Sequence, residues 1–318
     1  MVEAAIEHLL DAPGKQLRPL LVHLAASLGD PPPGAVRDVA VAAELIHLAS
    51  LVHDDILDGA SHRRGQPALH VLRGPGVATL VGDFLFSRAF DLLARHARLG
   101  VVTTMARAIT CMCEAELDQR ARRGDLGITA AEYLEQCRKK SGALMAASAL
   151  AGGQVARLPG RWRECLYQYG LCLGSAFQII DDLLDITGDA ASLGKPVRQD
   201  LGRGVITLPV IWALADPRFG LQLREVLRSV DGQGDERWED AYRLVVMSTG
   251  WERATGAAMG LLGEARLHLE ELPSTPAREA LQGLIERLAG TLPARPAISP
   301  VYTGESAGQA AGDAVVQV

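Results

Sequence analysis

The chain has 318 residues, and its apolar share of 48 % gives ample material for a hydrophobic core. It carries 32 basic and 38 acidic residues, a net charge of −6, which excludes the strongly basic surface typical of nucleic-acid-binding domains. No apolar run reaches the ~18 residues of a membrane span, and no signal-peptide pattern opens the chain. The five cysteines show no zinc-type spacing, so we expect free thiols and a cytoplasmic protein.

Helical periodicity recurs along the chain, whereas the alternation typical of strands is almost absent. The pattern predicts helices over residues 35–58, 77–97, 100–123, 129–153, 161–187, 205–215, 219–230, 237–249, 252–271 and 276–290. Breaks between them coincide with glycine and proline, for example in residues 31–34, 74–76 and 188–204. From residue 293 the periodic pattern gives way to Pro, Gly, Ala and Ser. We therefore expect a domain over residues 1–292 and a disordered tail over residues 293–318.

Two of the predicted helices are apolar nearly all the way round. These segments are residues 39–52 and 171–186. A helix of this kind is buried inside a bundle, because a surface helix would keep one polar face. The sequence therefore predicts an all-α protein built as a single domain.

A D-D-x-x-D motif occurs in each of these two apolar helices. The six aspartates are Asp54, Asp55, Asp58, Asp181, Asp182 and Asp185. Residues at i and i+4 project from one helix face, so each motif gathers like charges on one turn. Burying an unpaired carboxylate costs on the order of several kcal/mol, so a cation must neutralise the clusters. Oxygen ligands favour Mg²⁺ or Mn²⁺, and two facing clusters fit a diphosphate held through several Mg²⁺ ions.

A solvated acidic face is the alternative interpretation of such a motif. The neighbours of both motifs are apolar, for example Ile56 beside the first and Leu183 beside the second. Two motifs in apolar helices favour clusters at the mouth of a buried region.

Several further motifs resemble those of the polyprenyl synthetase family, the trans-isoprenyl diphosphate synthases. In the family's order they are G-K-Q-L-R-P at 14–19, E-L-I-H at 44–47, S-L-V-H-D-D at 50–55, R-R-G-Q-P at 63–67, G-D-F-L at 82–85, K-S-G at 140–142, F-Q at 177–178, G-K-P at 194–196 and T-L-P at 207–209. The chain most resembles catalytic subunits of heptaprenyl diphosphate synthases. The resemblance implies an antiparallel bundle of about ten helices around a central cavity. It also implies a homodimer, or a heterodimer with a small subunit.

The resemblance implies a role for each matching residue. Isopentenyl diphosphate would be bound by Lys15, Arg18, His47 and Arg64. The allylic diphosphate would be bound by Arg63, Lys140, Ser141, Gln178 and Lys195. The main magnesium ligands would be Asp54, Asp58 and Asp181, with Asp55, Asp182 and Asp185 beside them. The residues on which catalysis would depend are Asp54, Asp55, Asp58, Asp181, Asp182 and Lys140. The residue types agree, because arginine binds phosphate bidentately and lysine supplies a point charge.

The implied reaction is a condensation of two diphosphates. Metal ions and bases would stabilise the departing diphosphate of the allylic substrate, and a carbocation would form in a dry apolar cavity. The double bond of isopentenyl diphosphate would then attack it, and the released diphosphate would take the proton. Three alternatives stay open: a short-chain geranylgeranyl or farnesyl diphosphate synthase, a class I terpene cyclase, and a non-catalytic partner subunit. A cyclase needs no second diphosphate site, and a non-catalytic subunit would be expected to have lost aspartates.

Product length is predicted from the residues just before the first motif. Ala49 and Ser50 precede Asp54 by five and four residues, and both are small. Short-chain members of the family typically place aromatic residues there as a floor. Small residues predict a medium or long product, of about thirty to forty carbons or more, with a deeper floor at a residue such as Phe84, Phe86 or Met112.

Three positions depart from the family's usual pattern. Val205 stands where many members have lysine, Arg198 where a glycine is usual, and Ser141 where threonine is usual. A positive φ at position 198 would be awkward for arginine, so we expect a different loop there.

Overall fold

The computed structural model describes residues 2–11, 14–32, 34–97, 100–187, 198–229 and 237–296. Its first helices are α1 (Val2–Leu10), α2 (Leu17–Ala26), α3 (Ala35–Asp58), α4 (Leu69–Arg73), α5 (Pro75–Ala94) and α6 (Val101–Ala121). They are followed by α7 (Ala130–Cys137), the π-helical turn η2 (Arg138–Gly142), α8 (Ala143–Val155) and α9 (Gly160–Thr187). The remaining elements are the 3-10 turn η3 (Leu201–Arg203), α11 (Leu208–Leu214), α12 (Gly220–Ser229), α13 (Arg237–Met247), α14 (Gly250–Glu270) and α15 (Pro276–Ala289).

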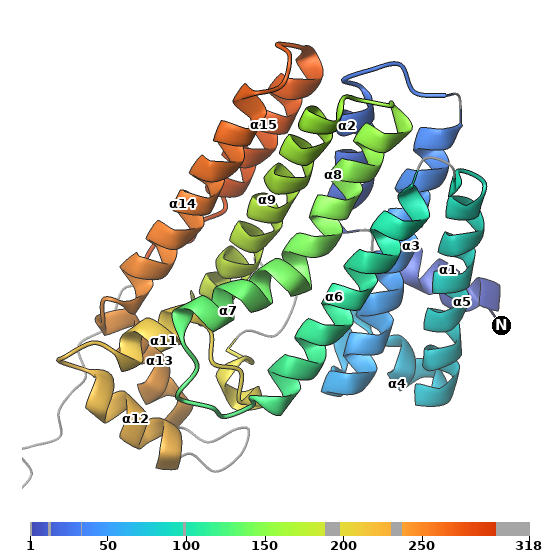
Figure 1. The fold of residues 1–318 in the computed structure, drawn as a ribbon. Coiled ribbons are helices and arrows are strands. Elements are labelled where there is room, and N and C mark those ends of the chain that lie inside the picture. Colours follow the sequence, from blue (N-terminus) through green and yellow to red (C-terminus); the bar gives the residue numbers. More distant parts are fainter. Residues whose placement is uncertain are drawn as a thin grey trace, which may run out of the picture.

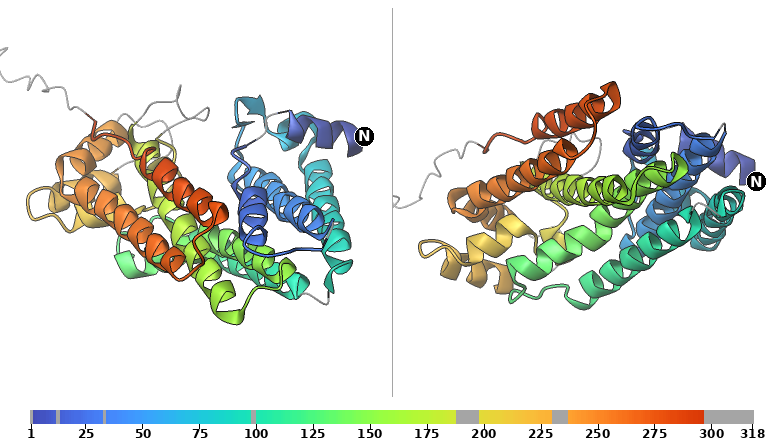
Figure 2. Two further views of the ribbon diagram at one scale, coloured as in Figure 1. Left: turned by 90° about the horizontal axis from the view of Figure 1, so that it is seen from above. Right: turned by 45° about the horizontal axis from the view of Figure 1, so that its top comes forward.

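The long helices lie side by side as a bundle, and the short helices α11, α12 and α13 gather at one end of it (Figure 1). Helices α8 and α9 run through the middle. The amino-terminal helices flank them on one side and α14 and α15 on the other (Figure 2). Helices α3, α6 and α9 all finish at the lower end of the bundle in Figure 1. Residues from the last turns of these three helices therefore lie within reach of one another.

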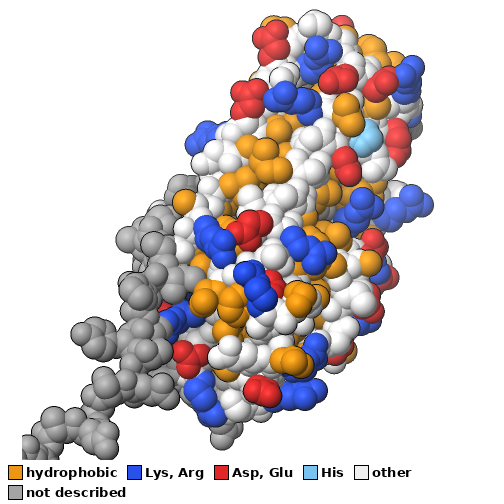
Figure 3. Space-filling view, turned by 90° about the vertical axis from the view of Figure 1, so that its left-hand side faces the viewer, with side chains coloured by type: hydrophobic (Ala, Val, Ile, Leu, Met, Phe, Trp, Pro, Cys, Tyr) orange, Lys and Arg blue, Asp and Glu red, His pale blue; other side chains and the backbone are white. Residues whose placement is uncertain are grey.

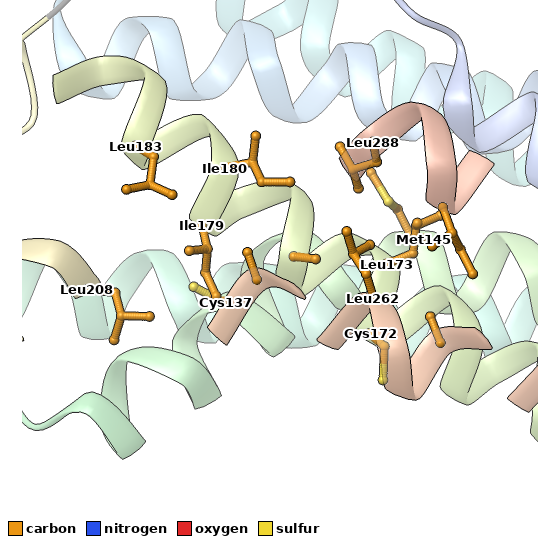
Figure 4. Packing of buried hydrophobic residues seen from close by; sticks show 14 of the residues in the cluster. Cys137, Met145, Cys172, Leu173, Ile179, Ile180, Leu183, Leu208, Leu262 and Leu288 are labelled. Carbon is orange, nitrogen blue, oxygen red and sulfur yellow. The ribbon is translucent and has the colours of Figure 1, made fainter. Parts of the chain in front are cut away.

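The centre of the bundle is packed from α9 outward. Leu173 and Ile180 of α9 are 2 % exposed, and they belong to one cluster with Met145 of α8, Leu262 of α14 and Leu288 of α15 (Figure 4). Burying a side chain of this size contributes about 1.5–3 kcal/mol. The apolar circumference of α9 is thus explained by neighbours on several sides.

Two glycines let α9 approach α8 and the turn η2 before it closely. A Cβ atom on Gly170 would lie 2.6 Å from the Cα atom of Ala146, and one on Gly174 would lie 2.7 Å from the carbonyl oxygen of Ser141. Real side chains are not accommodated at such distances. The absence of a side chain at both positions therefore sets the separation of these helices.

The expected helix over residues 129–153 exists, but a wider turn interrupts it. Its start is a capping box, in which the Thr129 hydroxyl accepts from the Glu132 backbone N–H over 3.2 Å and the Glu132 carboxylate accepts from the Thr129 N–H over 2.9 Å. The π-helical turn η2 then separates α7 from α8. Such turns are frequent at functional sites, and this one contains Lys140 and Ser141.

The all-α prediction is confirmed, and the bounds of α3 agree with the predicted 35–58. Helices α1, α2 and α4 and the short hairpin of β1 (His62–Arg63) and β2 (Gln66–Pro67) were not predicted. Helix α2 contains Pro19, a residue that usually argues against a helix. This proline lies in the first turn of α2, where no backbone donor is needed.

Two of the sequence expectations concern positions outside the described residues. They are the role of Lys195 and residues 297–318 of the expected tail. Arg295, within the described start of that segment, donates from Nε to the Val246 carbonyl over 2.8 Å and pairs with Glu252.

Acidic and basic side chains are interspersed on the face formed by the carboxyl-terminal helices (Figure 3). This face shows no uniformly basic patch, in agreement with the net charge. Among the described residues, no helix combines the length and apolarity needed to cross a bilayer.

Candidate active site

The first aspartate motif occupies the last turn of α3. Asp55 is 5 % exposed and accepts from Arg63 Nε over 2.9 Å. Arg63 reaches back because the hairpin turns at Arg64 and Gly65, whose φ angles are 52° and 78°. Two positive φ values in sequence are typical of the tight turns that join two strands. The hairpin therefore carries one base of the R-R-G-Q-P segment onto the motif.

Asp58 is paired with bases from two other parts of the chain. Arg120 Nη2 and Arg123 Nη2 each donate to Asp58 Oδ1 over 3.0 Å, and Arg203 Nη1 lies 3.7 Å from Asp58 Oδ2. Arg120 is in α6, Arg123 follows it, and Arg203 is in η3. This last aspartate of the motif thus connects three elements.

Asp54 is the carboxylate of this motif that the surroundings stabilise least. Burial raises its pKa to about 6, and the nearby Glu116 and Asp58 act in the same direction against Lys140 and Arg63. A carboxylate that is costly to ionise gains most from a metal ion. This cost is the observation that fits a divalent cation at the first motif.

The π-helical turn joins α6 to α9. Lys140 Nζ donates to Glu116 Oε2 over 2.9 Å and to Gln119 Oε1 over 2.6 Å. The Ser141 hydroxyl donates to Gln178 Oε1 over 2.5 Å, and Gln178 Nε2 donates to Asp182 Oδ1 over 2.9 Å. A chain of polar contacts therefore links the turn to the second aspartate motif.

The second motif lies on the last turns of α9. Asp182 and Asp185 are 3 % and 4 % exposed, whereas Asp181 is half-buried. Asp185 Oδ1 accepts from the Gln199 backbone N–H over 3.2 Å, and Asp185 Oδ2 accepts from the Asp200 N–H over 3.4 Å. Asp185 therefore binds the backbone of residues 199–200 with both oxygens.

The departure at position 198 has a visible consequence. Arg198 adopts a φ of 59°, so the arginine takes up the positive φ that we expected it to avoid, and this residue is strained. Its guanidinium lies 5.5 Å from the centre of the Tyr242 ring and pairs with Glu239. These contacts offset the strain and tie the loop to α13.

A pocket opens between the ends of α3, α6 and α9. Its walls contain acids of both motifs, bases, and groups that hydrogen-bond. The lining includes Asp58, Gln119, Arg123, Lys140, Gln178, Asp182, Asp200, Arg203, Val205 and Thr207. Among the described residues, no three carboxylate, histidine or cysteine side chains converge as a complete metal site. Carboxylates on two sides of a pocket fit Mg²⁺, which usually takes a few protein carboxylates and completes its shell with water and phosphate.

A second basic cluster lies beside the hairpin, on the amino-terminal part of α2 and the middle of α3. Burial lowers the pKa of Arg18 to about 10. The nearby Arg64 acts in the same direction, and Glu44 acts against it. Burial also holds the pKa of His47 well below 6.5, and Arg18, Arg64 and Arg63 act in the same direction. The Arg64 guanidinium lies against Gly14, where a Cβ atom would leave it no room. Among the described residues, the buried Arg18 Nε atom has no hydrogen-bond partner.

The predicted residues are thus brought together in two groups. Asp58, Asp182, Lys140 and Gln178 line the pocket, with Arg63 bound to Asp55 of the first motif and Ser141 bound to Gln178, whereas Arg18, His47 and Arg64 form the second cluster. Lys15, the other predicted member of that cluster, lies with its Nζ atom 5.4 Å from the centre of the Phe177 ring. Ala49 is fully buried against α5 residues such as Leu85, and Ser50 is half-buried.

Site residues of α6, of the segment after it and of η3 were not predicted. They are Glu116, Gln119, Arg120, Arg123 and Arg203. A signal was present in the spacing of Glu116, Gln119 and Arg120, which places polar residues on one face of an otherwise mixed helix. No local pattern indicates that Arg203 lies near Asp58, because the two residues are far apart in the sequence.

The chain matches the polyprenyl synthetase family over residues 1–245. It is 40 % identical to the short chain isoprenyl diphosphate synthase of Methanothermobacter thermautotrophicus, over 87 % of this chain and 86 % of that protein. It is 36 % identical to heptaprenyl diphosphate synthase component 2 of Geobacillus stearothermophilus, over 89 % and 87 %. A polyprenyl synthase from Caulobacter crescentus, solved with calcium and isoprenyl diphosphate, superposes with a TM-score of 0.84 at 35 % identity, over 90 % and 88 %.

The family match covers well over half of the chain, and relatives above 30 % identity cover most of its length. In this chain, Asp58 of the first motif and Asp182 of the second line one pocket together with bases. This chain therefore belongs to the polyprenyl synthetase family and is a transferase of prenyl groups.

Proposed function

We propose that this prenyltransferase condenses isopentenyl diphosphate with an allylic diphosphate, in trans, to give a medium- or long-chain polyprenyl diphosphate. One observation carries the proposal. The pocket between the aspartate motifs and the cluster of Arg18, His47 and Arg64 are two basic sites, which Arg63 and Arg64 of the hairpin connect. Two neighbouring basic sites suit two diphosphates, whereas a cyclase would need one.

In this proposal the pocket takes the allylic diphosphate. Arg63, Lys140 and Gln178 would bind its oxygens, and the Ser141 hydroxyl would hold Gln178 in place. The carboxylates of Asp54, Asp58, Asp181 and Asp182 would hold Mg²⁺, which supplies Lewis-acid stabilisation of the departing diphosphate. The Caulobacter crescentus polyprenyl synthase forms a complex with calcium and isoprenyl diphosphate, which supports this choice of ligands.

The second cluster takes isopentenyl diphosphate. Arg18 and Arg64 can each bind phosphate bidentately, and Arg18 Nε is already buried and lacks a hydrogen-bond partner among the described residues. A bound diphosphate would satisfy this desolvated guanidinium and offset the repulsion between the two arginines. Binding of an anion to this cluster is therefore expected to be favourable.

The small residues before the first motif support a product beyond the short-chain range. Ser50 lies one turn before Asp54 on α3, and its hydroxyl is turned to the His47 carbonyl over 2.8 Å. No large side chain stands at this position. We also propose a dimer, with itself or with a small subunit, as the name heptaprenyl diphosphate synthase component 2 suggests for that relative. The five free cysteines support a reducing compartment such as the cytoplasm.

The test is product analysis of the purified chain with farnesyl diphosphate, labelled isopentenyl diphosphate and Mg²⁺. We expect label in a product longer than geranylgeranyl diphosphate. Asp54→Ala and Asp181→Ala should each reduce turnover about a hundredfold or more while the circular dichroism spectrum is unchanged. Consumption of farnesyl diphosphate without incorporation of label would indicate a cyclase, and near wild-type turnover of either variant would contradict the assigned site.

A further inference from the structure

Three arginines meet at one carboxylate of the site, and the family resemblance assigns none of them. Arg120 and Arg123 donate to Asp58 Oδ1 over 3.0 Å, and Arg203 approaches Asp58 Oδ2 at 3.7 Å. We call these three residues the Asp58 arginine cluster. Its members come from α6, from the segment after α6, and from η3.

The cluster faces the same pocket as the proposed allylic diphosphate site. Arg123 and Arg203 line that pocket together with Lys140 and Gln178. The side chains of Arg123 and Arg203 are 37 % and 26 % exposed, so both reach solvent within the pocket. Arg120 differs, because it also pairs with Glu116 at 3.0 Å and donates to the Leu57 carbonyl over 3.2 Å. Arg123 and Arg203 are therefore the two members with the freedom to change partners.

A single carboxylate cannot serve a divalent cation and three guanidinium groups equally well. A cation on Asp58 competes with the arginines for the same oxygens, and like charges repel at such distances. A guanidinium released from a carboxylate retains its fork of donors, which suits phosphate oxygens as well as carboxylate oxygens. The natural new partner is a diphosphate in the pocket that Arg123 and Arg203 line.

We propose that Arg123 and Arg203 are exchangeable binding residues: they hold Asp58 in the metal-free chain and bind the diphosphate when a divalent cation takes Asp58. This inference rests on the proposed function and deepens it. It follows that the two arginines weaken binding of Mg²⁺ alone and strengthen binding of diphosphate. It also follows that metal and diphosphate favour each other's binding, by reciprocal coupling.

Binding measurements separate these effects without an activity assay. Isothermal titration of the purified chain with Mg²⁺ alone, and then with inorganic diphosphate in the presence of saturating Mg²⁺, would be compared for wild type, Arg123→Gln and Arg203→Gln. We expect each substitution to tighten Mg²⁺ binding about threefold and to weaken diphosphate binding by a similar factor, the scale of a partly exposed ion pair. The matched control is Arg122→Gln, which removes the same charge from the neighbouring residue, whose partner is Glu132 at 2.9 Å.

Removing the charge of Asp58 gives an independent test. Asp58→Asn releases the arginines, so diphosphate alone should bind more tightly than to wild type. Asp118→Asn is the control, since it removes the same charge from an exposed position of α6. Each single arginine variant leaves two members of the cluster on Asp58, so we expect all of these proteins to fold, as circular dichroism would check. If an arginine variant unfolds, the Asp58→Asn comparison decides.

The outcomes distinguish this inference from the proposed function. Wild-type chain that binds diphosphate with Mg²⁺, while the arginine variants match Arg122→Gln and Asp58→Asn matches Asp118→Asn, would overturn the exchange and leave the function standing. Wild-type chain that binds no diphosphate even with Mg²⁺ would overturn both. Opposite shifts for Mg²⁺ and diphosphate, confined to Arg123 and Arg203, would support the exchange.

Discussion

Helix α9 passes so close to the π-helical turn that a Cβ atom on Gly174 would lie 2.7 Å from the carbonyl oxygen of Ser141. The same atom would lie 2.8 Å from the Cα atom of Gly142. Both neighbours are backbone, which cannot yield as a flexible side chain can. The position of Ser141, and of Lys140 before it, therefore depends on a missing side chain one helix away.

Gly174→Ala should push the π-helical turn away from α9. We expect the free energy of unfolding to fall by about 1–3 kcal/mol, the usual cost of overpacking. Turnover should fall as well, because the Ser141 hydroxyl would no longer reach Gln178. Urea unfolding and steady-state kinetics measure the two effects. The control is Gly263→Ala in α14, where a Cβ atom meets nothing within 4 Å, so stability should rise by up to about 1 kcal/mol. Equal stability of the two variants would contradict the close approach.

The buried His47 should make stability depend on pH. Because its pKa in the folded chain lies well below 6.5, the unfolded chain binds a proton first as the pH falls. The stability that neutral His47 contributes is therefore fully present above about pH 6.5 and is lost as the pH falls from there toward the folded-state pKa. His47→Gln should lose less stability than wild type between about pH 7.5 and 5.5. Thermal unfolding across this range measures the difference.

The exposed His23 of α2 provides the control, and His23→Gln should keep the wild-type dependence. Inorganic diphosphate should raise the melting temperature of wild type more at the acidic end of the range, since an anion beside Arg18 and Arg64 favours protonated His47. The same acid sensitivity in wild type and His47→Gln would show that another group is responsible.

Product length should respond to Ser50 more cleanly than to Ala49. Ala49 is fully buried between α3 and α5, so Ala49→Phe would overpack the core at a cost of about 1–3 kcal/mol. Ser50 is half-buried, one turn before Asp54. We expect Ser50→Phe to shorten the main product, as judged by chromatography of the dephosphorylated prenols. Val41→Phe, at a 44 % exposed position of the same helix, should leave it unchanged. Products of unchanged length from Ser50→Phe would count against a tunnel along α3.

Asp185 should tolerate loss of its charge better than Asp181. Its two carboxylate oxygens accept from the backbone N–H groups of Gln199 and Asp200, so we expect it to hold this backbone in place. Asn keeps one acceptor. We expect Asp185→Asn to retain about a tenth or more of the wild-type kcat, whereas Asp181→Asn should fall about a hundredfold or more. Steady-state kinetics at saturating Mg²⁺ compare them, and an equal loss in both would assign Asp185 to the metal.

The local pattern determined the helices that carry the chemistry. The bounds of α3 were predictable because its apolar residues repeat with helical periodicity between Gly34 and Gly59, and both glycines adopt left-handed conformations outside the helix. The spacing within each D-D-x-x-D motif likewise places carboxylates on one turn whatever the rest of the chain does. The prenyl-transferring family was recognisable from short motifs of this kind.

Only the tertiary structure decided which side chains are paired with the carboxylates of the site. Arg63 reaches Asp55 because a hairpin folds back, Lys140 reaches Glu116 through a π-helical turn, and Arg203 reaches Asp58 from a segment far along the chain. Periodicity reports the face of one helix, not which distant side chain is packed against it. The ion pairs form where the ends of α3, α6 and α9 meet, and the packing of the bundle sets that meeting point.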